Sequence, residues 1–131
     1  LKGAPMLIKK VTYTDYNGEE RTDTLYFNLN KSELMKWELS QQGGLKAKLE
    51  QIIESKDVPA IAQVFEEIIS KSYGVKSPDG NRFIKSKELL DEFMQTEAYS
   101  ELYMTLATNS DEANKFIKGI LPKESALQPA T

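Results

Sequence analysis

The carboxylates and hydroxyls of this sequence are the side chains that could do chemistry. Acidic residues stand side by side at three points of the chain, at Glu66-Glu67, Asp91-Glu92 and Asp111-Glu112. Two carboxylates can hold a divalent cation or share acid–base work only when they converge from separate elements. Adjacent residues of a helix point about 100° apart. The pairs are therefore interpreted as solvated helix faces rather than as a catalytic or metal site.

Histidine and cysteine are both absent from the chain. The chain thus lacks the side chain that most often transfers protons near neutral pH, and it lacks a thiolate nucleophile or metal ligand. The hydroxyls of Ser32, Ser70 and Ser100 have no histidine to activate them. We predict no enzymatic activity, no catalytic residues, no metal site and no cofactor.

The length and net charge of the chain limit the kinds of protein that it can be. The 131 residues suit one domain, and the net charge of −3 disfavours general affinity for nucleic acid. No apolar run reaches the roughly 18 residues that a membrane-spanning helix needs. We expect a soluble cytoplasmic protein without a membrane partner.

Charge is segregated along the second half of the chain. Residues 71–87 contain five basic side chains and a single acidic one, Asp79, whereas residues 88–114 contain seven acidic side chains and no Lys or Arg. Three interpretations stay open for the basic stretch: a nucleic-acid contact with Phe83 as a stacking residue, a solvated loop, or self-association with the acidic face of another copy. Tyr99 and Tyr103, one helical turn apart, fit either an interface or half-buried core. The candidate association residues are Lys76, Arg82, Phe83, Lys85, Lys87, Glu97, Tyr99, Glu101 and Tyr103.

These residues must be positioned by a hairpin and a series of helices. Two β-prone runs around Asn17-Gly18 predict a β-hairpin over residues 7–29. A two-residue loop would place odd positions opposite even ones and split the apolar residues between two faces. A three-residue loop from Tyr16, with Gly18 in the left-handed region, keeps them on one face and is preferred.

The residues after the hairpin are predicted to form helices, which are separated by N-cap residues and by glycines. Asn30 and Glu33 predict a capping box that starts a helix over residues 31–40. The pair Gly43-Gly44 lacks the spacing of a phosphate-binding loop and is read as a break before a helix over residues 45–55. The next helix is expected to start after Asp57, to have an apolar stripe from Val58 to Ser72, and to end with a C-cap at Gly74. A loop over residues 75–85 follows it, and Phe83-Ile84 is expected to anchor this loop to the core. Three further helices are expected after caps at Ser86, Thr96 and either Asn109 or Ser110, with the last ending at Gly119 and Pro122.

The expected fold is therefore α+β and mainly α, with an N-terminal β-hairpin packed on a bundle of four to six short helices over residues 31–120. We expect one domain over residues 6–122, after an artificial extension at 1–5 and before a flexible tail at 123–131. The predicted core comprises Leu25, Phe27, Leu34, Leu49, Ile53, Ile61, Phe65, Ile68, Phe93, Leu102, Phe116 and Ile117.

Seven short segments together resemble a known family. They lie at residues 25–29, 30–34, 43–45, 72–77, 79–86, 93–101 and 106–108. The chain resembles, from about Lys9 to Lys123, the small tail assembly chaperones of long-tailed phages and prophages of Gram-positive bacteria.

The resemblance implies a small, non-enzymatic, largely helical protein. Such a chaperone would hold the tape-measure protein in the bacterial host cytoplasm while tail-tube subunits polymerise around it, and would be absent from the mature virion. Its partners would be the tape-measure or tail-tube protein, and self-association is compatible with that role. A permanent virion component such as a head–tail connector is the alternative, and a small nucleic-acid-binding regulator comes after it.

Overall fold

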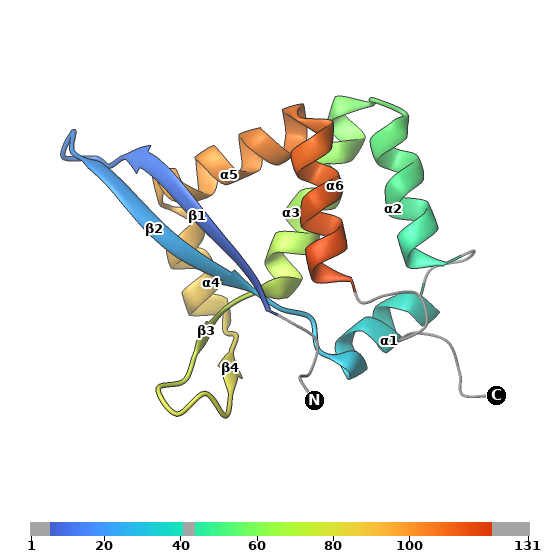
Figure 1. Cartoon of the computed structure of the whole chain (residues 1–131), viewed down its shortest axis with the longest axis horizontal. Coiled ribbons are helices and arrows are strands. Elements are labelled where there is room, and N and C mark those ends of the chain that lie inside the picture. The colour runs from blue at the N-terminus through green and yellow to red at the C-terminus, as the bar shows by residue number, and fades with distance from the viewer. Residues whose placement is uncertain (1–5, 41–43, 122–131) are drawn as a thin grey trace.

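The computed structural model of the chain describes residues 6–40 and 44–121. Its helices are α1 Lys31–Leu39, α2 Leu45–Glu54, α3 Val58–Ser72, α4 Lys87–Met94, α5 Glu97–Thr108 and α6 Ser110–Ile120. Its strands are β1 Leu7–Thr14, β2 Glu20–Phe27, β3 Tyr73–Lys76 and β4 Phe83–Ile84. This α+β, mainly helical arrangement confirms the expected fold class (Figure 1). The expected extension at 1–5, the break residue Gly43, the terminator Pro122 and the tail at 123–131 lie outside the described residues.

The N-terminal hairpin has the predicted loop. β1 and β2 pair antiparallel with odd positions opposite odd positions. The backbone N–H of Asp15 donates to the carbonyl of Glu19 at 2.8 Å, and Gly18 has a φ of 81°. These features confirm the three-residue loop with Gly18 in the left-handed region.

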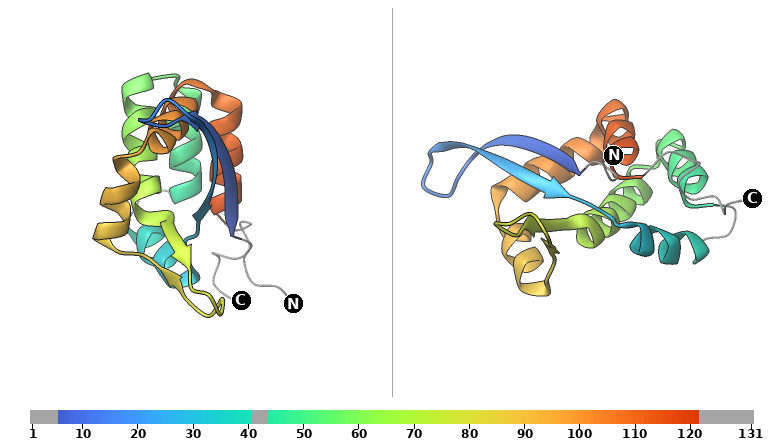
Figure 2. Two further views of the ribbon diagram at one scale, coloured as in Figure 1. Left: turned by 90° about the vertical axis from the view of Figure 1, so that its left-hand side faces the viewer. Right: turned by 60° about the horizontal axis from the view of Figure 1, so that its bottom comes forward.

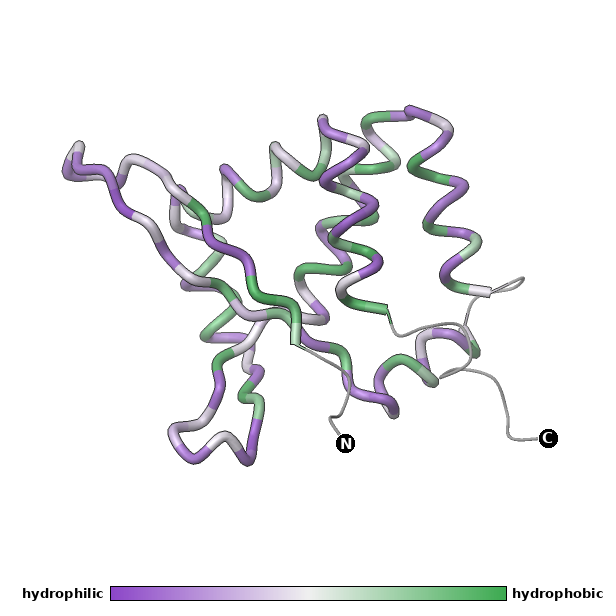
Figure 3. The backbone as a smooth tube through the Cα atoms, viewed as in Figure 1, coloured by the Kyte–Doolittle hydropathy of each residue, from purple (hydrophilic) through white to green (hydrophobic). Residues whose placement is uncertain are grey.

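That register gives the hairpin one buried face. Val11, Tyr13, Leu25 and Phe27 are buried, while the Thr12 hydroxyl lies on the opposite, exposed face. The buried face packs on α5 and α6, and the free end of the hairpin extends away from the helices (Figures 1 and 2). Figure 3 shows that the turns of both hairpins are hydrophilic.

The sequence predicts a helix cap at Gly74 and a loop over residues 75–85, and this prediction is wrong. Strands β3 and β4 form in this region instead. α3 ends at Ser72, and the chain becomes extended at once as β3. β3 pairs with the end of β2, and β4 pairs with β3, so that the sheet has the order β1-β2-β3-β4. The strand pairs supply the backbone hydrogen bonds that a loop would have taken from water. The predicted turn at residues 77–80 is present and joins β3 to β4.

Gly74 has a packing role rather than the predicted helix-capping role. A Cβ atom at this position would lie 2.7 Å from the carbonyl oxygen of Ile84 and 2.6 Å from Cε2 of Phe83. Only glycine permits this approach of β3 to β4 without a shift of the backbone. Phe83 is half-buried and lies against Gly74 of β3.

Aromatic rings connect the hairpin to the helices through the centre of the core. The ring of Phe27 makes edge contacts with Tyr73, Phe93 and Phe116, at centroid distances of 5.9, 6.4 and 5.1 Å, and Phe116 continues the contact to Phe65. Every position predicted for the core is buried.

Two smaller expectations are wrong. Val58 is 50% exposed in the first turn of α3, so the apolar stripe of this helix is buried only from Ile61 onward. α6 continues through Gly119 to Ile120, and a Cβ at Gly119 would lie 2.6 Å from Cδ1 of Leu7. This glycine therefore makes room for β1 instead of ending the helix.

Replacing Phe116 with alanine should remove the ring that joins Phe27 to Phe65. We expect Phe116→Ala to lower the free energy of unfolding by about 3–5 kcal/mol, because a fully buried ring leaves a cavity. Urea denaturation measures this change. Val58→Ala is the control, with an expected change within about 0.5 kcal/mol at its exposed position, and equal effects of the two substitutions would contradict the core assignment.

Gly74→Ala should destabilise the contact between β3 and β4. We expect a loss of about 1–3 kcal/mol, because the added methyl group meets backbone and the chain must shift. Val75→Ala, at the exposed neighbouring position, should change stability by about 0.5 kcal/mol or less. A stabilising effect of Gly74→Ala in urea denaturation would show that the glycine is present for another reason.

Candidate functional site

A groove of about 490 Å³ lies between α1 and the C-terminal end of α3. We call it the basic groove, and its lining residues are Leu29, Glu33, Lys36, Trp37, Ser40 and Lys71. Leu29 and Trp37 are nearly buried and supply an apolar floor. Lys36 and Lys71 are exposed and stand at its rim. The groove thus combines an aromatic surface with positive charge.

The capping box predicted from the sequence sets the position of the groove. The Asn30 side chain accepts a hydrogen bond from the Glu33 backbone N–H at 2.9 Å, and the Glu33 carboxylate accepts one from the Asn30 backbone N–H at 2.9 Å. This reciprocal pair fixes the first turn of α1. Trp37, one turn after Glu33, is thereby directed toward the body of the protein.

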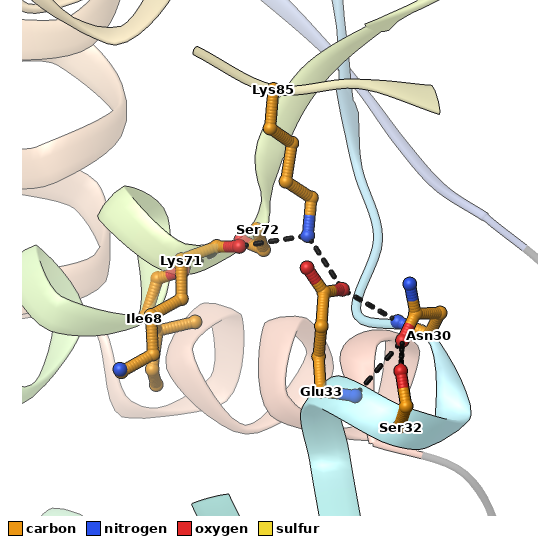
Figure 4. A network of polar contacts seen from close by, with 7 residues as sticks. All are labelled: Asn30, Ser32, Glu33, Ile68, Lys71, Ser72 and Lys85. Carbon is orange, nitrogen blue, oxygen red and sulfur yellow. Dashed lines mark hydrogen bonds and ion pairs between the residues drawn. The ribbon is translucent and has the colours of Figure 1, made fainter. Parts of the chain in front are cut away.

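An ionic link ties this capping box to α3 (Figure 4). The Lys85 ammonium donates to Oε1 of Glu33 and to the backbone carbonyl of Lys71, both at 2.8 Å. The carbonyl belongs to the last turn of α3, where a cation is favourable because the C-terminal carbonyls carry partial negative charge. Lys85 also balances the negative charge of Glu33, which leaves the cations of the rim in excess.

The two rim lysines differ in their surroundings. The Lys71 ammonium lies 5.3 Å from the centre of the Trp37 ring, within the range of a cation–π contact. Among the described residues Lys36 makes no ion pair at 4 Å or less. Lys36 is therefore available to an acidic group of a partner.

The residues predicted near the second hairpin have unequal roles. Lys85 is half-buried and takes part in the ionic link to Glu33 and to the Lys71 carbonyl. Lys87 pairs with Asp91 at 2.8 Å. Lys76 lies over the ring of Tyr26, with 5.6 Å to its centre, and Arg82 is exposed at the turn.

The residues predicted on α5 form a separate group. Tyr99 packs edge-on against Phe93 at 5.4 Å and stacks on Tyr103 at 5.7 Å, so this pair is half-buried. Glu97 accepts a hydrogen bond from the Tyr16 hydroxyl at 3.2 Å, and Glu101 is exposed. α4 separates this group from the second hairpin (Figure 1). The structure therefore does not unite the predicted residues in one site.

The groove residues Leu29, Lys36, Trp37 and Lys71 are absent from the predicted site. The available signal was the one tryptophan of the chain, placed beside a lysine in a short capped helix. Lys71 belongs to the basic stretch but lies far from α1 in sequence. Folding of the chain is therefore needed to bring its ammonium over the Trp37 ring.

Several acidic side chains in the described part of the chain are held in their charged form by hydrogen bonds. Residues 6–40 and 44–121 contain no cluster of three or more acidic side chains that could hold a metal ion. A hydrogen bond from Lys9 lowers the pKa of Glu112, one from Ser77 lowers that of Asp79, and one from the Glu19 backbone lowers that of Asp15. Proton transfer at neutral pH needs a shift in the other direction. None of the helices in these ranges has the length and apolar character required to cross a bilayer.

Comparison with known proteins identifies a family. A family model described as phage tail assembly chaperone matches residues 6–129. No curated protein and no solved structure matches the chain.

The ionic link at Lys85 should contribute to stability, whereas that at Lys87 should not. The two ion pairs have the same length of 2.8 Å, but the lysine side chains are 23% and 84% exposed. We expect Lys85→Met to lower the free energy of unfolding by about 1–2 kcal/mol, since Glu33 and the Lys71 carbonyl both lose the donor that the half-buried Lys85 side chain supplies. Lys87→Met, the matched control, should leave the urea midpoint unchanged, because solvent screens exposed pairs. Equal midpoints for the two variants would contradict this assignment.

Proposed function

The chain belongs to the phage tail assembly chaperone family, and on that premise we propose that it acts as a non-enzymatic chaperone that holds the tape-measure protein while the tail tube polymerises. This family membership confirms the resemblance read from the sequence. A tail assembly role implies phage tail proteins as partners. The finer parts of the proposal are the tape-measure protein as the client, the basic groove as its binding site, and release of the chaperone before the virion is complete.

The observation that carries the proposal is the basic groove. Its floor of Leu29 and Trp37 can cover apolar side chains, and Lys36 and Lys71 can pair with carboxylates. An amphipathic helix with acidic residues beside its apolar stripe has the matching chemistry. Contacts between exposed charges are screened by salt, within about 8 Å at physiological ionic strength, so such binding is reversible, as a chaperone requires.

The place of action follows from the role. A protein that binds the client only during assembly works in the host cytoplasm and is absent from the mature virion. It can act there as a monomer or as a homo-oligomer. The charge of the groove does not favour a nucleic-acid regulator, because the cations stand on a rim beside α1 and on a hairpin turn instead of along a recognition helix.

Co-purification with candidate tail proteins tests the client. We expect the full chain to retain the tape-measure protein at low salt and to lose it at high salt. The double variant Lys36→Glu, Lys71→Glu should weaken retention at least about tenfold, because two attractive contacts become repulsive. The control is Lys56→Glu, Lys118→Glu, which reverses two exposed lysines outside the groove and should bind as the unchanged chain does.

Two outcomes would reject parts of this proposal. Equal binding by both double variants would exclude the basic groove as the site. Stoichiometric amounts of the chain in purified virions, measured by mass spectrometry, would support a permanent structural component such as a head–tail connector instead.

A further inference from the structure

The sheet leaves one long strand edge unpaired. Its strand order is β1-β2-β3-β4, so β1 and β4 are the two edge strands. β4 has two residues, whereas β1 has eight and pairs with β2 in one continuous register. Natural proteins often protect an exposed edge by a bulge, a proline or a very short strand. β1 has none of these features, so its edge can accept a further strand.

The hydrogen-bond pattern shows which backbone groups of β1 face outward. The N–H of Asp15 donates to the carbonyl of Glu19 at 2.8 Å, so the pairs at odd positions are the hydrogen-bonded ones. The even positions of β1, among them Lys10 and Thr12, lie in the alternate pairs, whose backbone groups point away from β2. Within the described part of the chain, these groups of Lys10 and Thr12 have no hydrogen-bond partner.

This edge is accessible over the half of β1 next to the hairpin turn. The right-hand view of Figure 2 shows no helix beside that half on the side away from β2. Lys10, Thr12 and Thr14 have exposed side chains on one face of the strand. Val11 and Tyr13, on the other face, are buried. A strand added at this edge would therefore continue the sheet without displacing the core.

The charge of β1 selects the kind of strand that can bind. The Lys9 ammonium, on the buried face, is paired with Glu112 at 3.2 Å. Lys10, on the exposed face, makes no ion pair within 4 Å among the described residues. A neighbouring strand places a side chain opposite Lys10 on the same face, where opposite charges attract and like charges repel. A carboxylate is the side chain that suits this position.

The same lysine disfavours a second β1 strand as the occupant. In an antiparallel pair of two β1 strands, even positions would lie opposite even positions. In registers centred on the strand, Lys10 of one copy then lies opposite or diagonal to Lys10 of the other. Both arrangements bring two unpaired ammonium groups together on one face. The occupant is therefore a strand of the opposite charge.

We propose that the open edge of β1 binds an extended acidic segment of a partner protein, which adds a fifth strand to the four-stranded sheet. The segment forms backbone hydrogen bonds with Lys10 and Thr12 and places a carboxylate opposite Lys10. Ile8, 55% exposed on the same face, offers an apolar contact two positions along the strand. Backbone pairing supplies the affinity, and the alternate side chains supply the selectivity. The segment recognised is a β-prone run in which an acidic and an apolar residue stand two positions apart.

This edge differs from the basic groove in position and in the shape of its ligand. The groove lies between α1 and the end of α3 and suits a helix, whereas the edge of β1 suits an extended chain. Binding at the edge does not require the tape-measure protein to be the client of the groove. The two sites can therefore be tested separately.

A synthetic peptide tests the backbone pairing directly. The probe is a fluorescent peptide with the eight-residue length of β1, in which glutamate and valine alternate on one face and threonine occupies the other. Two further versions carry N-methyl groups at one or the other alternate set of residues, so that every side chain is kept. Fluorescence anisotropy at low salt should show saturable binding of the probe to the full chain. The version that lacks the N–H groups facing β1 should bind at least about tenfold more weakly than the other.

Equal binding of the two methylated versions would overturn the proposal, because side chains alone would then explain the contact. Absence of saturable binding of the unmethylated probe would also overturn it. Both outcomes are measured on the unchanged chain, so neither depends on whether a variant folds.

Substitutions at Thr12 separate its backbone from its side chain. Thr12→Pro removes an outward N–H and leaves the hydrogen bonds to β2 intact, because proline is tolerated on the open side of an edge strand. It should weaken binding of the probe about tenfold, whereas Thr12→Ala, which keeps the N–H, should bind within about twofold of the unchanged chain. Circular dichroism and urea denaturation verify that both variants are folded. Equal binding by the two folded variants would contradict the proposed pairing.

Charge reversal tests the choice of an acidic segment. Lys10→Glu should weaken binding of the glutamate probe about fivefold and should favour a probe with lysine in place of glutamate. The groove variant Lys36→Glu, Lys71→Glu should bind the probe as the unchanged chain does. Weaker binding by the groove variant would place the contact in the groove instead. Analytical ultracentrifugation in which Thr12→Pro converts a dimer to a monomer would identify a second copy as the occupant and overturn the proposal.

Discussion

The packing of the Phe27 ring is the contact on which the rest of the structure depends. This fully buried residue ends β2 and touches Tyr73 of β3, Phe93 of α4 and Phe116 of α6. A two-stranded hairpin is marginally stable alone. The ring gives the hairpin a core to pack on, and it brings elements from both ends of the chain to one point.

The basic groove is a consequence of the same arrangement. Because β2 ends at Phe27, the chain enters α1 through Leu29 and the capping box at Asn30, and α1 is held beside the end of α3. The link from Lys85 to Glu33 and to the Lys71 carbonyl then fixes the distance between the two helices. The polar groups of Asn30, Glu33 and Lys85 stabilise the fold at this junction. The charge of the groove comes from Lys36 and Lys71.

Helix α1 combines two tasks in nine residues. Leu34 anchors it to the core, and Trp37 forms the groove floor.

The sequence by itself determined what depends on neighbours along the chain. Helix starts such as the capping box at Asn30, the hairpin loop at Gly18 and the buried positions followed from spacing and from local hydrogen bonds, and the family followed from short motifs. Only the tertiary structure decided the rest. The pairing of β3 with β2 and the partners of Lys85 join residues distant in sequence, 52 positions apart for Lys85 and Glu33. Local sequence patterns do not predict such contacts, because the partner of a lysine in a basic stretch depends on which distant residues the folded chain places beside it.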